Sequence, residues 1–146
     1  MPARFDSFGI QFLYPDNWKT VDREESEGDD GVTFDLPGGG FLSVELTDHA
    51  SESELIDGIV AAISEEYEEL EREISALDVL PDGVNATDLR FYYLDLLIVS
   101  RIVVLRHSAI PADSLLVVQM QAESRDFDKN EAVFSAVLKQ IVDQDF

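Results

Sequence analysis

The 146-residue sequence has no cysteine and only two histidines, His49 and His107. The absence of cysteine excludes disulfides, thiolate metal sites and cysteine nucleophiles. A serine–histidine catalytic site is not indicated, because the sequence contains no G-x-S-x-G motif and both histidines stand at expected element ends. We therefore expect no catalytic residues, no cofactor and no enzymatic activity.

Long apolar runs are also missing. The longest tract, FYYLDLLIVSRIVVL, is interrupted by Asp95, Ser100 and Arg101, so no segment is expected to cross a membrane. The first residues, MPARFDSFGIQF, lack the apolar core that a signal peptide places behind a basic start. These features predict a cytoplasmic protein without a membrane partner.

Positive charge is scarce. Ten lysines and arginines face 31 aspartates and glutamates, which gives a net charge of −21. A field of this sign repels phosphate backbones, so nucleic acid is not an expected partner. It favours a basic protein partner, divalent cations, or simple solubility in a salty cytoplasm.

The pattern of apolar residues predicts one domain spanning residues 1–146, with strands in its first third. Apolar residues alternate over 8–14, 32–36 and 41–47, as expected for half-buried strands, and Trp18 is expected to begin a further strand. PGGG at 37–40 predicts a turn. Residues 51–70 then carry apolar residues at helical spacing behind a Ser51-x-x-Glu54 capping box.

The second half repeats this order. REISALDVL, at 72–80, reads as a strand that ends at a Pro-Asp-Gly turn. The segment from Thr87 to His107 is too long for one strand and must fold back, with Asp95 the best turn candidate. A further strand and a helix starting near Asp126 to Asp128 complete the chain. We predict an α+β fold: a twisted, mainly antiparallel sheet flanked by two main helices in an α/β/α sandwich.

The segment FLYPDNWKTV, at 12–21, reads as a corner between two strands. We expect Pro15 at the second position of a turn through Asp16 and Asn17, with Tyr14 and Trp18 packed side by side.

This corner and the element order resemble the Mog/PsbP-like superfamily, which includes DcrB-type bacterial proteins and cytoplasmic chaperones of type VI secreted toxins. The specific matches are Tyr14-Pro15 and Trp18, with a looser one in FDKNEAVFSAVLKQI near the C-terminus. The resemblance implies a non-catalytic scaffold that binds other proteins.

An acidic loop is the best candidate for metal binding. Carboxylates suit hard cations such as calcium, although the spacing here does not match an EF-hand loop. The weak metal candidates are Asp22, Glu24, Glu25, Glu27, Asp29 and Asp30. The alternative interpretation is a solvated hairpin tip.

Basic and aromatic side chains in the long strand region are candidates for binding a partner protein, because arginine and tyrosine are enriched at interface hot spots. The candidates are Arg90, Tyr92, Arg101 and Arg106. Cross-strand ion pairing with neighbouring acids is the alternative role. Arg101 and Arg106 would face opposite ways in an unbroken strand, which argues against one shared patch.

Two functional hypotheses follow. The first is a non-enzymatic protein-binding module, for example a cytoplasmic chaperone or accessory factor, whose sheet face or edge receives an apolar or basic segment. The alternative is a cation-binding or enzymatic protein that uses the acidic 22–30 loop. A salt-adapted homodimer is a third interpretation.

Overall fold

A computed structural model describes residues 2–7, 9–21, 31–47, 51–67, 69–106, 110 and 113–143. The chain begins with five strands: β1 (Ala3–Ser7), β2 (Ile10–Tyr14), β3 (Lys19–Thr20), β4 (Gly31–Asp35) and β5 (Phe41–Thr47). Helix α1 (Glu52–Glu66) follows, and then β6 (Glu71–Ser75), β7 (Ala86–Tyr93), β8 (Leu96–Leu105), β9 (Leu115–Glu123) and helix α2 (Ser124–Asp143). The predicted α+β class is confirmed.

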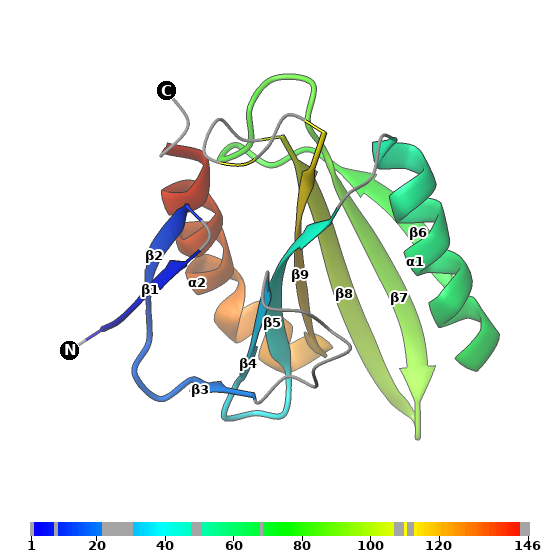
Figure 1. Ribbon diagram of the computed structural model, residues 1–146. Helices are drawn as coiled ribbons and strands as arrows, with labels where there is room; N and C mark the ends of the chain where they lie inside the picture. The colour runs from blue at the N-terminus through cyan, green and yellow to red at the C-terminus, as the bar shows by residue number, and fades with distance from the viewer. Residues whose placement is uncertain are drawn as a thin grey trace.

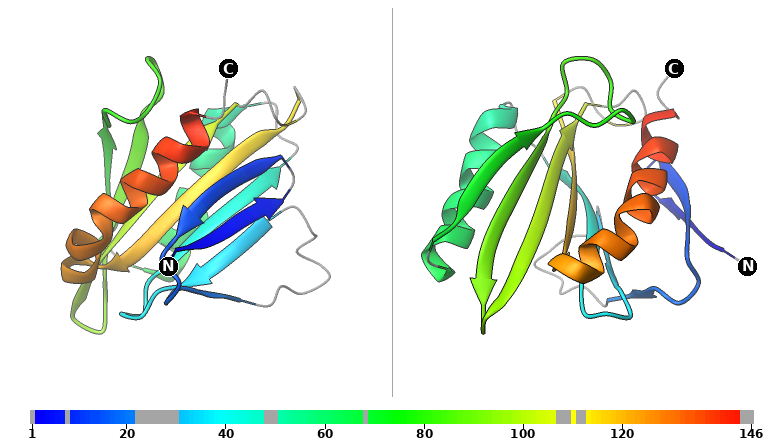
Figure 2. Two further views of the ribbon diagram at one scale, coloured as in Figure 1. Left: turned by 90° about the vertical axis from the view of Figure 1, so that its left-hand side faces the viewer. Right: turned by 180° about the vertical axis from the view of Figure 1, so that it is seen from behind.

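Seven strands form one antiparallel sheet in the order β3-β4-β5-β9-β8-β7-β6. Helix α2 covers one face together with the hairpin β1–β2, and α1 lies on the other face (Figures 1 and 2). The central strands β8 and β9 are buried or half-buried along nearly their whole length because both of their faces are covered. The predicted sandwich of a sheet between two helices is therefore confirmed.

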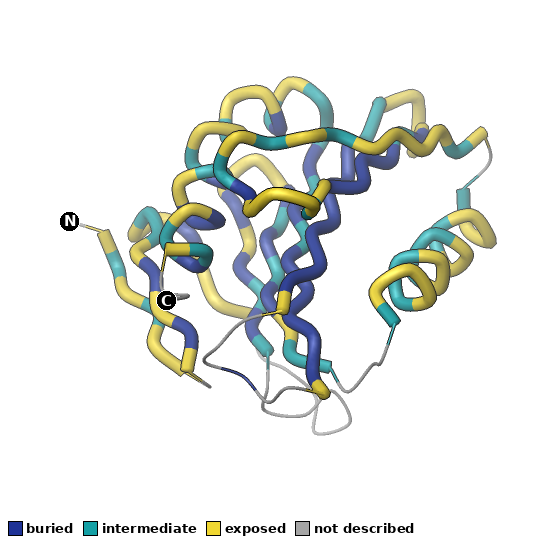
Figure 3. The backbone as a smooth tube through the Cα atoms, turned by 90° about the horizontal axis from the view of Figure 1, so that it is seen from above, coloured by how far each residue is buried: buried dark blue, intermediate teal, exposed yellow. Residues whose placement is uncertain are grey.

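The two faces are covered to different extents (Figure 3). Five residues of α2 are fully buried: Phe127, Phe134, Val137, Leu138 and Ile141. No residue of α1 is buried to that degree, although its apolar stripe packs on Leu89, Phe91 and Ile102 of the sheet. Helix α1 is thus the more exposed layer of the sandwich.

The N-terminal segment differs from the expectation of one strand over 8–14. The structure has a hairpin of β1 and β2 that forms its own two-stranded sheet. Gly9, at φ 84°, lies where the chain reverses, and Phe8 lies outside the described residues. Gln140 of α2 holds this hairpin, since its amide pairs with the backbone N–H and C=O of Leu13 at 2.8 and 3.1 Å.

The corner at 14–18 is confirmed in its packing and corrected in its turn. The rings of Tyr14 and Trp18 stack with centroids 6.4 Å apart, and Trp18 is buried. The Trp18 N–H donates to the Pro15 carbonyl at 3.1 Å, so Pro15 holds the first turn position rather than the second. The following strand begins at Lys19, after the tryptophan.

Several element ends were predicted well and others were not. Ser51 caps α1, accepting from the Glu54 N–H at 3.3 Å, and PGGG is a turn between β4 and β5. The chain folds back at Leu94 and Asp95, as Asp95 suggested. Strand β6 ends at Ser75 rather than near residue 80, and α2 starts at Ser124, before the predicted 126–128.

Candidate functional site

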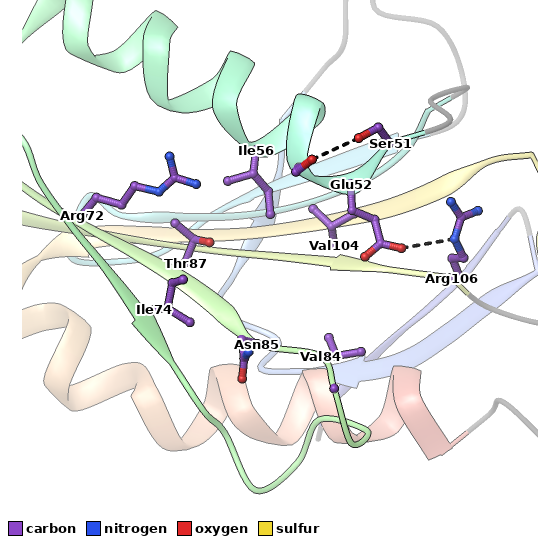
Figure 4. A pocket seen from close by; sticks show the side chains of 12 residues that line it. Ser51, Glu52, Ile56, Arg72, Ile74, Val84, Asn85, Thr87, Val104 and Arg106 are labelled. Atoms are coloured by element: carbon purple, nitrogen blue, oxygen red, sulfur yellow. Dashed lines mark hydrogen bonds and ion pairs between the residues drawn. The ribbon is translucent and has the colours of Figure 1, made fainter.

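A groove opens on the α1 side of the sheet, between the first turn of α1, the strand β6 and the segment leading into β7 (Figure 4). Its volume is about 540 Å³. The apolar part of its lining comes from four separate elements of sequence: Ile56, Ile74, Val84 and Val104. Charged and polar groups at the rim include Glu52, Arg72, Asn85 and Arg106.

The register of β6 explains which of its side chains reach the groove. Arg72 lies opposite Leu89 and Ile74 lies opposite Thr87, and residues paired across an antiparallel ladder share a face. Leu89 packs under α1, so Arg72 and Ile74 also project to the α1 side. Ile74 remains 68% exposed, which leaves an apolar side chain at the open margin of the groove.

Two exposed ion pairs tie α1 to the sheet across the groove. The Arg72 guanidinium donates to Asp57 at 3.0 Å, and Arg106 donates to Glu52 at 3.1 Å. All four side chains are roughly half exposed, so each pair is worth at most about 1 kcal/mol. A charged ligand group could therefore replace either partner at low energetic cost.

Strand β6 ends the sheet, and no other described strand pairs with its outer side. In an antiparallel edge strand, alternate backbone N–H and C=O groups point away from the neighbouring strand. The groove consequently adjoins a row of main-chain donors and acceptors that can extend the sheet.

A different arrangement lies under α2. The buried Arg101 guanidinium donates to both oxygens of Asp88, at 2.8 and 3.0 Å, and to Glu131 of α2 at 3.0 Å. Ser75 donates to the same aspartate at 2.8 Å, and the Arg101 guanidinium lies 5.2 Å from the centre of the Phe127 ring. This cluster satisfies its own charges.

The electrostatics of the cluster favour the charged forms. Burial raises the pKa of Asp88, but the hydrogen bonds from Arg101 and Ser75 and the charges of Arg101 and Arg90 outweigh it, so that pKa lies below its ordinary value. Burial lowers the pKa of Arg101, whereas Asp88 and Glu131 raise it above its usual range. The pair is ionised at neutral pH.

The candidate partner-binding residues fall on both sides of the sheet. Arg90, Tyr92 and Arg101 face the α2 side, as their register with Glu71, Leu97 and Asp88 shows, and Arg106 lines the groove on the α1 side. Arg90 is paired with Glu73 at 2.8 Å, and Tyr92 is 57% exposed. Ion pairing is thus observed for all three arginines, and the role of the four residues in binding stays a prediction.

The acidic loop and both histidines lie outside the described residues, so the prediction of a cation site there also remains a prediction. Among residues that the structure does describe, no three His, Asp or Glu side chains are grouped to hold a metal ion. No described helix is long and apolar enough to cross a membrane.

Sequence reasoning missed Arg72, Ile74 and the groove itself. The only signal was that Ile74 is an isolated apolar residue between charged and polar neighbours in EREIS. Its significance depends on β6 being an edge strand, which follows from the order of strands in the sheet and is not encoded in five residues.

Comparison with known structures identifies proteins of similar fold. No family model and no curated protein sequence matches the chain. The solution structure of cyanobacterial PsbP (CyanoP) from Synechocystis sp. PCC 6803 matches at 19% identity over 95% of this chain and 90% of its own, with a TM-score of 0.59. The Ran-binding protein Mog1p of Saccharomyces cerevisiae matches at 9% identity over 99% and 94%, with the same score.

A protein of unknown function from Pseudomonas aeruginosa also matches, at 12% identity over 97% of this chain and 96% of its own, with a TM-score of 0.53. These likenesses cover nearly the whole chain at low identity, which is typical of a shared fold. The chain therefore has a Mog/PsbP-like fold.

Proposed function

We propose that the chain is a protein-binding module that receives an extended segment of a partner along the outer edge of β6. The observation that carries this proposal is the groove with an apolar lining beside an edge strand whose outer side no described strand pairs. Main-chain hydrogen bonds to β6 would supply affinity, and a partner side chain in the groove would supply specificity, which is how strand addition works in general.

The chemistry of the groove favours a segment with both apolar and basic residues. Ile56, Ile74 and Val104 offer apolar surface, and burying one large aliphatic side chain contributes about 1.5–3 kcal/mol. Helix α1 itself carries five acidic residues and no basic one, so a lysine or arginine on the partner is attracted to the α1 side. Glu52, which pairs with Arg106 at an exposed site, is the carboxylate among the described residues that line the groove and would receive it.

The fold supports a role in binding, since a Ran-binding protein shares it. Fold alone does not determine function, and the superfamily resemblance adds only that cytoplasmic chaperones and accessory factors use the same scaffold. We propose that the chain belongs to this class, as a cytoplasmic, non-enzymatic chaperone or accessory factor that holds a segment of another protein.

The test compares three tagged versions of the full chain, purified from cells that naturally make it: wild type, Ile74→Asp and Leu13→Asp. Leu13 is a matched control because it is another exposed aliphatic residue, 47% accessible, on β2 at the far side of the molecule (Figure 1). Thermal melting should first show that both variants are folded.

We expect one protein to co-purify in near-stoichiometric amount with wild type and with Leu13→Asp, and to fall about tenfold with Ile74→Asp. That factor corresponds to about 1.4 kcal/mol, which the loss of one buried aliphatic group supplies. Recovery of the same proteins in equal amounts with all three versions would show that the groove is not the binding site.

A further inference from the structure

The other end of α1 faces an exposed apolar feature that the groove does not use. Strands β7 and β8 are joined by a two-residue turn, Leu94-Asp95. The side chains around it are unusually exposed for their type: Tyr92 is 57%, Tyr93 52%, Leu94 79% and Leu96 43% accessible. We call these four residues the hairpin tip.

Leu94 is poorly suited to its backbone conformation. Leu94 and Asp95 both have positive φ, at 49° and 67°, as in the tight hairpin turn that normally selects Asn-Gly. A leucine there gains no burial and adopts a conformation that side chains other than Asn, Asp and Gly rarely take. The stability of the hairpin does not explain a leucine at this position. Contact between Leu94 and the surface of another molecule would explain it.

The tip is held firmly at its base. The Tyr67 ring, just after α1, stacks on Phe91 at 4.5 Å and meets Tyr93 edge-on at 6.0 Å. Phe91 is buried in the core under α1. The tip is thus presented on a packed support, which lowers the entropy cost of docking it.

Carboxylates lie beside the hairpin tip, and their negative charges reduce the stability of the chain on its own. The last turn of α1 holds Glu65 and Glu66 and no basic residue, although the C-terminal end of a helix carries partial negative charge. Glu69 follows in the link to β6, and Asp95 lies in the turn itself. A surface carrying positive charge would relieve this local repulsion.

We propose that the hairpin tip is a second docking surface, which inserts Leu94, with Tyr93 on one face of the hairpin and Tyr92 on the other, into an apolar hollow of a partner protein whose rim carries lysine or arginine. It is separate from the groove: the two lie at opposite ends of α1, whose 15 residues span roughly 22 Å. The proposal does not depend on the groove being occupied. The acidic border disfavours an anionic lipid surface as the occupant.

Site-specific photo-crosslinking tests this proposal. The full chain is produced in its native cells with benzoylphenylalanine in place of Leu94 or, as the control, in place of Leu13. Adducts are digested and the crosslinked peptides are identified by mass spectrometry. Each version is then made in three backgrounds: unchanged, Glu65→Lys with Glu66→Lys, and Ile74→Asp.

We expect position 94, and not position 13, to crosslink one protein in a segment whose apolar residues are flanked by lysine or arginine. The adduct yield should fall at least fivefold with the two glutamate reversals and stay unchanged with Ile74→Asp. The Ile74→Asp background separates the hairpin tip from the groove. If the groove proposal is wrong, the crosslink from position 94 is still expected.

Each of four results would overturn the proposal: no adduct specific to position 94, an adduct with lipid, an adduct with a second copy of this chain, or a yield insensitive to the glutamate reversals. Thermal melting of the reversed variant guards against misfolding. Its melting temperature should not fall, because lysine at the end of α1 complements the helix dipole.

Discussion

Arg101 on β8 and Asp88 on β7 form a two-bond ion pair in the interior, with Nε donating to Oδ1 at 2.8 Å and Nη2 donating to Oδ2 at 3.0 Å. The side chains are only 9% and 3% exposed. The pair stands directly opposite in the β7–β8 register, and it joins the sheet to α2 through Glu131.

Asp88→Asn should lower the free energy of unfolding by about 3–5 kcal/mol, because it removes the two-bond carboxylate partner of a buried guanidinium and leaves it only the half-exposed Glu131. Urea unfolding measures this directly. Glu73→Gln is the control, since it breaks the exposed pair with Arg90 and should cost less than about 1 kcal/mol. Equal losses of unfolding free energy for the two substitutions would show that the Asp88–Arg101 pair contributes no more to stability than an exposed ion pair.

The same pair predicts a pH dependence. The pKa of Asp88 is lower in the folded state than in the unfolded chain, where an aspartate titrates near about 3.9. Between these two pKa values the unfolded state therefore binds more protons than the folded state. The stabilisation from Asp88 is fully present above the unfolded pKa and is lost as the pH falls through the folded pKa.

The measurement is the difference in unfolding free energy between wild type and Asp88→Asn across pH 7 to 2. This difference cancels the global effect of the −21 charge. It should be constant down to about pH 5 and shrink below about pH 4. A difference that grows on acidification would contradict the assigned direction of the pKa shift.

Two glycine-to-alanine substitutions should have opposite effects. A Cβ at Gly40 would lie 2.5 Å from the Gln121 carbonyl oxygen and 2.7 Å from the Ala122 Cβ, so Gly40→Ala should destabilise by about 1–3 kcal/mol. A Cβ at Gly58 meets no described atom within 4 Å inside α1, so Gly58→Ala should stabilise by about 0.5–1 kcal/mol. Thermal unfolding of both variants, referred to wild type, checks the two signs.

Much of the fold follows from the sequence because its patterns are local. Alternation locates β4 and β5, the three- and four-residue steps locate both helices, and the Ser51 cap fixes the start of α1. The turn at Asp95 follows from the length of the apolar tract.

The features that could not be predicted depend on contacts between residues far apart in the sequence. The hairpin β1–β2 forms its own sheet and is held to α2 through Gln140, which is 127 positions from Leu13. Whether Arg101 faces solvent or Asp88 depends on the register of β7 with β8. The exposure of Ile74 depends on β6 being an edge. Local sequence carries none of these three facts.

The turn at the hairpin tip can be tested for stored strain. Replacing Leu94→Asn and Asp95→Gly together gives the sequence preferred by a turn with two positive φ angles. We expect the double variant to gain about 1 kcal/mol in unfolding free energy. A loss of stability would show that Leu94 contributes to the fold of the isolated chain.

Amide hydrogen exchange of the chain, free and bound to the partner recovered with wild type, tests the central claim most directly. Added strand pairing should slow exchange of the amides of β6, Glu71–Ser75, that point away from β7, and leave β1 and β2 unchanged. Protection that appears elsewhere and leaves β6 unaltered would contradict binding along this edge.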